Sequence, residues 1–205
     1  GAIAAGSGAN LSFGSIGAGL NTGLFAQGNV TGAATVSDGN LSVQADGDVT
    51  IGSATARGTA LDPFVGGPYD GNLFVIADGS VQLDAASARS MIGVRGATQV
   101  TGSGAWAAGE DILVLSDGTA NLATLTAGNQ IGVEAAGGMT LGTGTTLGTG
   151  PNDRFLSLFV STAPSFLINS GLTPATIRLT ASAGAVNFTT LDAAANLVVN
   201  ARDGI

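Results

Sequence analysis

The chain has 205 residues, of which 34 are glycine, 44 % are hydrophobic and 10 % are charged, and its formal net charge is −8. This apolar content excludes a disordered chain, and the absence of lysine leaves no basic stripe for binding nucleic acid. Cysteine is absent too, which excludes disulfides and thiolate catalysis, and no run of about 18 apolar residues predicts a transmembrane helix.

A repeat of about twenty residues runs along the chain. Residues 41–57 (LSVQADGDVTIGSATAR) and 73–89 (LFVIADGSVQLDAASAR) share one template, in which a small-Gly turn separates two stretches that alternate apolar and other residues. Further copies start at Ile92, Ile112, Ile131, Ile177 and Leu197. The regular spacing of these starts predicts one more copy near Leu156 or Leu158, between those at Ile131 and Ile177.

Three segments interrupt the repeat and are expected to be loops inserted at the sides of the coils. The first is 59–71, which contains two prolines and the only tyrosine of the chain. The second is 142–154, which is rich in glycine and threonine, and the third is 161–175. Proline and glycine clusters of this kind are typical of loops.

The template favours a coiled, all-β architecture. Alternation directs the apolar side chains of each strand to one face, and a single repeat cannot bury that face, whereas stacked repeats can. We therefore predict one domain over 1–205, a right-handed parallel β-helix (β-solenoid) of about nine coils. The chain would be a segment of a longer repeat protein or a stacking subunit. An antiparallel sandwich is the alternative, but it does not require near-identical twenty-residue segments.

Polar residues recur at two places in the repeat. One set immediately precedes a strand and would stack as a ladder at one corner: Asn40, Asn72, Asp111, Gln130 and Asn196. The other set lies in Asp-Gly turns, at Asp38, Asp46, Asp70, Asp78, Asp117 and Asp203. A column of stacked aspartates could bind calcium, but we expect these residues to cap turns in which the glycine takes a positive φ.

Catalysis is a weaker hypothesis. Some parallel β-helices act on polysaccharides, and glycosidases need two carboxylates about 5–10 Å apart, for which Asp46 with Asp48, or Glu110 with Asp111, are candidates. A lyase would need acidic residues beside a base, and the candidate pairs are Asp84 with Arg89 and Asp153 with Arg154. Without His, Cys or Lys the acid–base repertoire is small. We expect no catalytic, cofactor or metal site.

Candidate contact residues lie outside the regular repeats. Trp106 precedes the strand at Ile112 and is expected to be exposed at a corner, while Tyr69, Phe166 and Leu167 lie in insertions. The run 143-TGTTLGT-149 raises the idea of a flat threonine array that binds ice or another crystal. Such an array needs threonine at the same place on successive coils, and we expect a loop here instead.

Segments 39–58 (GNLSVQADGDVTIGSATARG) and 71–90 (GNLFVIADGSVQLDAASARS) resemble the repeats of filamentous haemagglutinin-like exoproteins, the β-helical passengers of two-partner secretion in Gram-negative bacteria. The likeness covers residues 30–205. It implies a right-handed helix, export to the extracellular space or outer cell surface, and an adhesive or structural role in contact with host or neighbouring cells. The family's Asn-Pro-Asn type secretion motif is not found, so the likeness is to the shaft. A self-assembling filament or surface-layer subunit is the alternative function.

Overall fold

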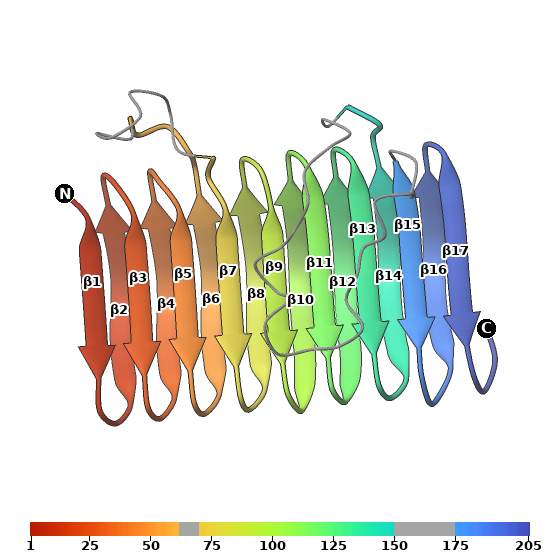
Figure 1. Ribbon diagram of the computed structural model, residues 1–205, viewed down its shortest axis with the longest axis horizontal. Coiled ribbons are helices and arrows are strands. Elements are labelled where there is room, and N and C mark those ends of the chain that lie inside the picture. Colours follow the sequence, from red (N-terminus) through yellow and green to blue (C-terminus); the bar gives the residue numbers. More distant parts are fainter. Residues whose placement is uncertain (62–69, 150–174) are drawn as a thin grey trace.

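The computed structural model describes residues 1–61, 70–149 and 175–205, which form a β-solenoid without helices. Successive strands alternate between two parallel sheets that face each other (Figure 1). The nine-stranded sheet contains β1 (Ile3–Ser7), β3 (Thr22–Ala26), β5 (Leu41–Ala45), β7 (Leu73–Ala77), β9 (Ile92–Gly96), β11 (Asp111–Ser116), β13 (Gln130–Ala135), β15 (Thr176–Ala181) and β17 (Asn196–Ala201). The eight-stranded sheet contains β2 (Leu11–Ala18), β4 (Val30–Ser37), β6 (Val49–Ala56), β8 (Val81–Ala88), β10 (Gln99–Ala108), β12 (Thr119–Ala127), β14 (Met139–Thr146) and β16 (Val186–Ala193).

The predicted β-solenoid of about nine coils is confirmed. Equivalent residues of neighbouring coils follow one another at a nearly constant interval along the chain, as for Ile3 opposite Thr22 and Thr22 opposite Leu41. At about 4.8 Å per strand, nine coils form a rod about 40 Å long. None of the described segments is a helix with the length and hydropathy needed to cross a bilayer.

The repeat register corrects two of the sequence predictions. β13 pairs directly with β15, with Ile131 opposite Ile177, so no coil lies between them and the copy predicted near Leu156 or Leu158 is wrong. The predicted second insertion, 142–154, is wrong at its start, because Gly142–Thr146 belong to β14. These residues pair with β12 and β16 like any other coil. Most of the predicted third insertion, 161–174, lies outside the described residues.

The predicted first insertion, 59–71, falls in the step between β6 and β7, and its residues 62–69 lie outside the described residues. β6 ends at Ala56 and β7 begins at Leu73, so this step between coils is longer than its neighbours, with Leu41 opposite Leu73. The extra residues leave the core unchanged, because Leu41 and Leu73 are both completely buried. The longer step between β6 and β7 thus does not shift the stacking of the strands.

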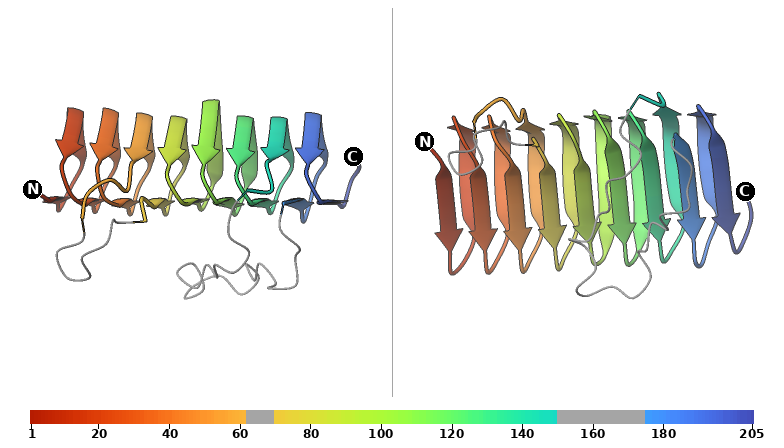
Figure 2. Two further views of the ribbon diagram at one scale, coloured as in Figure 1. Left: turned by 90° about the horizontal axis from the view of Figure 1, so that it is seen from above. Right: turned by 45° about the horizontal axis from the view of Figure 1, so that its top comes forward.

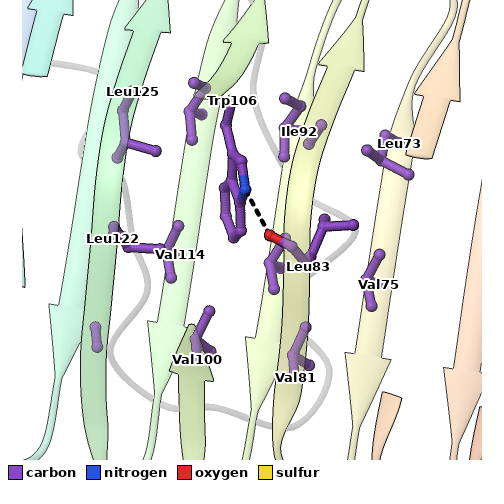
Figure 3. Packing of buried hydrophobic residues seen from close by; sticks show 14 of the residues in the cluster. Leu73, Val75, Val81, Leu83, Ile92, Val100, Trp106, Val114, Leu122 and Leu125 are labelled. Carbon is purple, nitrogen blue, oxygen red and sulfur yellow. Dashed lines mark hydrogen bonds between the residues drawn. The ribbon is translucent and has the colours of Figure 1, made fainter. Parts of the chain in front are cut away.

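The core follows from alternation within each strand. In β5 and β6 the side chains of Leu41, Val43, Val49 and Ile51 point inward and are at most 1 % exposed. The intervening residues point outward, as the exposed Ser42 shows. Burying a side chain of this size contributes roughly 1.5–3 kcal/mol, and the contribution recurs in every coil. Alanines are buried in the same core, and Figure 3 shows how its larger side chains pack between the two sheets.

Candidate functional site

The first corner of the solenoid carries the polar ladder predicted before the nine-stranded sheet. The Oδ1 atom of Asn21 accepts a hydrogen bond from the backbone N–H of Asn40 at 2.8 Å, and Asn40 Oδ1 accepts one from the N–H of Asn72 at 2.9 Å. Each side chain therefore binds the backbone of the next coil. The ladder stops at Asn72, whose buried Oδ1 has no hydrogen-bond partner among the described residues. In the next coil Met91 takes the ladder position.

The ladder resumes at Asp111, where the acceptor is a carboxylate. Its Oδ1 accepts hydrogen bonds from Gln130 N–H and from Asn129 Nδ2, both at 3.1 Å. Asp111 is only 4 % exposed. Loss of hydration on burial raises the pKa of Asp111 from 3.8 to about 6. The hydrogen bonds from Asn129 and Gln130 favour the charged carboxylate and lower the pKa, but they offset only part of this rise, and the negative charge of Glu110 raises the pKa further. At the last coil Asn196 lies opposite Thr176 and is exposed.

A second ladder, at the opposite corner, was missed by sequence reasoning. Asn10 Oδ1 accepts from Asn29 N–H at 2.8 Å, Asn29 Oδ1 from Asp48 N–H at 2.9 Å, and Asp48 Oδ1 from Ser80 N–H at 2.7 Å. The signal was present in the sequence, because each residue immediately precedes a strand of the eight-stranded sheet. It was overlooked because Asp48 was grouped with Asp46 as a possible acidic pair.

The structure gives the turn glycines a different role from the predicted one. Among the described residues, positive φ angles occur at Gly58, Gly71, Gly148, Gly184 and Gly204, and at Ala175. The expectation therefore fits Asp70-Gly71 and Asp203-Gly204 but is wrong for the glycines that follow Asp38, Asp46, Asp78 and Asp117. A Cβ atom on Gly39, Gly47 or Gly79 would instead overlap the Oδ1 of a ladder residue in the preceding coil. Glycine is required there because the ladder oxygen occupies the space.

This geometry predicts that Gly47→Ala lowers the free energy of unfolding by about 2 kcal/mol, the usual size of an overpacking penalty. The added methyl group would displace Asn29 Oδ1 and leave the N–H of Asp48 without its acceptor. Urea unfolding followed by circular dichroism measures the change.

Two controls make this prediction specific. Gly23→Ala, on an outward position of β3 with no atom within 4 Å of the new Cβ, should change stability little. In the double variant Asn29→Ala/Gly47→Ala the loss in free energy of unfolding should be about 1 kcal/mol smaller than the sum of the two single losses. The reason is that the new methyl group no longer meets Asn29 Oδ1. Strict additivity would contradict the proposed role of the ladder oxygen.

The turn aspartates lie at the surface of the coils. Asp46, Asp78 and Asp117 are exposed, and Asp117 Oδ2 lies 3.3 Å from Arg95 Nη2 in a surface ion pair. Within residues 1–61, 70–149 and 175–205, no three acidic side chains gather closely enough to hold a metal ion. These carboxylates contribute mainly surface charge.

The candidate acidic pairs are used in hydrogen bonds of the coils. Asp48 belongs to the second ladder and Asp111 to the first, and each accepts a backbone N–H of the next coil. Asp84 Oδ1 accepts from Ser103 Oγ at 3.0 Å, whereas Arg89 Nη1 donates to the carbonyl of Gly58 at 2.6 Å. Asp153 and Arg154 lie outside the described residues.

Trp106 is not a surface contact, and that prediction is wrong. Its side chain is 1 % exposed, and its indole N–H donates to the Leu83 carbonyl at 2.9 Å (Figure 3). β10 has an irregular register between Gly102 and Ala105, which brings Trp106 opposite Ala86 and into the core. A Cβ on Gly102 would lie 2.8 Å from the ring, so this glycine makes room for it. The other candidate contacts, Tyr69, Phe166 and Leu167, lie outside the described residues.

The outer face of the eight-stranded sheet presents polar, uncharged side chains in register. One column crosses all eight strands and consists of Ser12, Thr31, Thr50, Gln82, Thr101, Asn121, Thr140 and Asn187. A second column places Thr143 between Thr124 and Thr190, and Thr145 lies beside Thr126. The expectation that the threonines of 143–149 cluster in a loop is therefore wrong for Thr143 and Thr145.

The outer face of the nine-stranded sheet differs in chemistry. Its outward residues alternate with the core residues of each strand, and the partly or fully exposed ones include Phe25, Phe74, Ile76, Arg95, Glu134 and Arg178. On β11 the outward Leu113 and Leu115 are themselves buried. The two faces are therefore distinct surfaces, one rich in hydroxyl groups with Asp84 and Asp192 as its charged residues, and the other mixed apolar and charged.

No protein-family model, curated protein or solved structure matches this chain.

Proposed function

We propose that this chain is a shaft segment of an exported adhesin-like surface protein of a Gram-negative bacterium, similar to the filamentous haemagglutinin-like exoproteins of two-partner secretion. It acts outside the cell, as a rigid support that carries adhesive surfaces toward a host or neighbouring cell, and it catalyses no reaction. The observation that carries the proposal is one hydrophobic core that continues from coil to coil along the rod.

Rigidity follows from the hydrogen bonding of the turns as well as the strands. In successive coils Gly28 N–H donates to Ala9 O at 2.9 Å, Gly47 N–H to Gly28 O at 3.0 Å, and Gly79 N–H to Gly47 O at 3.0 Å. The turns are thus bonded along the rod, which leaves little loose backbone in the described coils. Proteases need such loose backbone, so a rod of this kind suits the extracellular space.

Antibody labelling of intact source cells tests the proposal. Surface labelling, together with removal of the label by external protease at loops rather than within coils, is the expected result. Retention of the protein inside intact cells would contradict it.

Electron microscopy of the purified chain addresses the second candidate, a self-assembling filament or surface-layer subunit. Short monodisperse rods are expected for a shaft segment. Long unbranched fibres whose length grows with protein concentration would replace the shaft proposal by the filament one.

A further inference from the structure

The outer face of the eight-stranded sheet is built from short side chains in a regular lattice. The strands lie side by side in one row (Figure 2, left), about 4.8 Å apart, and outward residues two apart in a strand are about 7 Å apart. Thr124 and Thr126 on β12 align with Thr143 and Thr145 on β14, and Thr190 extends the row on β16. Threonine therefore stands at the same place on successive coils.

The hydroxyl groups of this lattice are available for binding. Within the described residues, no hydrogen bond is formed by the side chains of Thr124, Thr126, Thr143, Thr145 or Thr190. By contrast Thr146, which faces inward on β14, uses its Oγ1 twice, donating to Ala175 O and accepting from Ala194 N–H. A free hydroxyl can both donate and accept, so the face presents a repeating array of both functions.

Strand propensity does not account for this distribution. Threonine is favoured on any exposed sheet, and that preference should act equally on both outer faces of the same coils. The outward positions of the nine-stranded sheet that are at least partly exposed nevertheless include phenylalanine, isoleucine, glutamine and charged residues, with Ser42 and Thr180 as hydroxyls. The hydroxyl array thus belongs to one face.

Charge is also excluded from most of this face. The outward residues of β10, β12 and β14 are uncharged although the whole chain has a net charge of −8. On the neighbouring strands, Asp84 accepts hydrogen bonds from Gln82 and Ser103, and Asp192 on β16 lies opposite Thr145 at the end of the row formed by Thr126 and Thr145. An uncharged surface matches an uncharged partner, because neither side gives up the hydration of an ion on contact.

We propose that the outer face formed by β10, β12, β14 and β16 of the eight-stranded sheet binds ice. Ice is an uncharged solid whose surface consists of hydrogen-bond donors and acceptors in a fixed lattice. It cannot adapt to the protein, so the protein must present its groups at regular positions, as this sheet does. The short side chains leave the face level, which suits a flat solid rather than a small molecule enclosed by a pocket.

The test is partition of the purified chain into slowly growing ice, together with thermal hysteresis of the solution. The wild-type chain is expected to enter the ice and to separate the melting and freezing points. Thr143→Lys should reduce partition at least about tenfold, because it places a hydrated charge in the centre of the array.

Thr180→Lys is the matched control, because Thr180 is an outward, partly exposed threonine on the opposite sheet. It should partition like the wild type, and circular dichroism should show that both variants are folded. Exclusion of the wild type from ice, equal partition of the two variants, or binding to cellulose or chitin powder without binding to ice would overturn the proposal. This readout is independent of the export and rod shape on which the shaft proposal depends.

Discussion

Replacing Trp106 with alanine is expected to lower the free energy of unfolding by about 3–5 kcal/mol, the usual cost of removing a fully buried aromatic side chain. The indole is the largest fully buried group among the described residues, and it fills the space between the two sheets near Leu83 (Figure 3). Neighbouring coils cannot collapse into the vacated volume, because their spacing is fixed by backbone hydrogen bonds along the rod. Chemical unfolding followed by far-UV circular dichroism measures the loss.

Trp106→Phe separates packing from hydrogen bonding. It keeps most of the apolar volume but removes the donor to the Leu83 carbonyl, and should cost about 1–2 kcal/mol. Blue-shifted fluorescence of this single tryptophan in the native wild-type chain should accompany the result. A cost for Trp106→Ala below about 1 kcal/mol, or emission typical of exposed tryptophan, would contradict the burial described here.

Replacing Asp111 with asparagine is expected to stabilise the protein at neutral pH. In the folded chain the pKa of Asp111 is raised from 3.8 to about 6 by burial, so folding favours the protonated carboxyl. Well below pH 3.8 the group is protonated in both states and costs nothing. Stability is lost as the pH rises through this interval, and above pH 6 the full penalty of about 3 kcal/mol applies. Asparagine keeps the acceptor for Gln130 and has no such penalty.

The measurement is urea unfolding of the wild type and of Asp111→Asn between pH 3.5 and pH 7.5. The two chains should have similar free energies of unfolding at the acidic end. Between pH 4 and pH 6 the wild type should lose stability relative to the variant, because Asp111 ionises in this interval. Asp46→Asn, which removes an exposed turn carboxyl, is the control and should change stability at pH 7 by less than about 0.5 kcal/mol. A constant difference at all pH values would show that the burial of Asp111 is not the cause.

Several features of the fold could be predicted because they depend on residues close together in the sequence. Alternation in segments such as Leu41–Ala45 and Val49–Ala56 determines which side chains face inward. Because this pattern recurs at a regular interval, the apolar faces can be covered only by stacking the copies. The ladder at Asn40 was visible for the same reason, since its position relative to the strand repeats. The insertion at 59–71 was visible as an interruption of that repeat.

Other features were decided by contacts between coils. The space needed by Asn29 Oδ1 explains Gly47 better than any backbone preference of the turn itself, and that oxygen comes from the preceding coil. Trp106 was expected at an exposed corner, but the irregular register of β10 places its side chain in the core. The direct pairing of β13 with β15 removed a coil that spacing alone had predicted.

The sequence by itself determined that this chain coils, because period-two alternation and regular turns are local properties that every repeat carries. Only the tertiary structure decided which outward residues become neighbours. Thr124, Thr143 and Thr190 are far apart in the sequence, and they form one row because strand register, not sequence distance, decides which residues meet across a parallel sheet. The burial of Asp111 and the hydroxyl face both arise from that register.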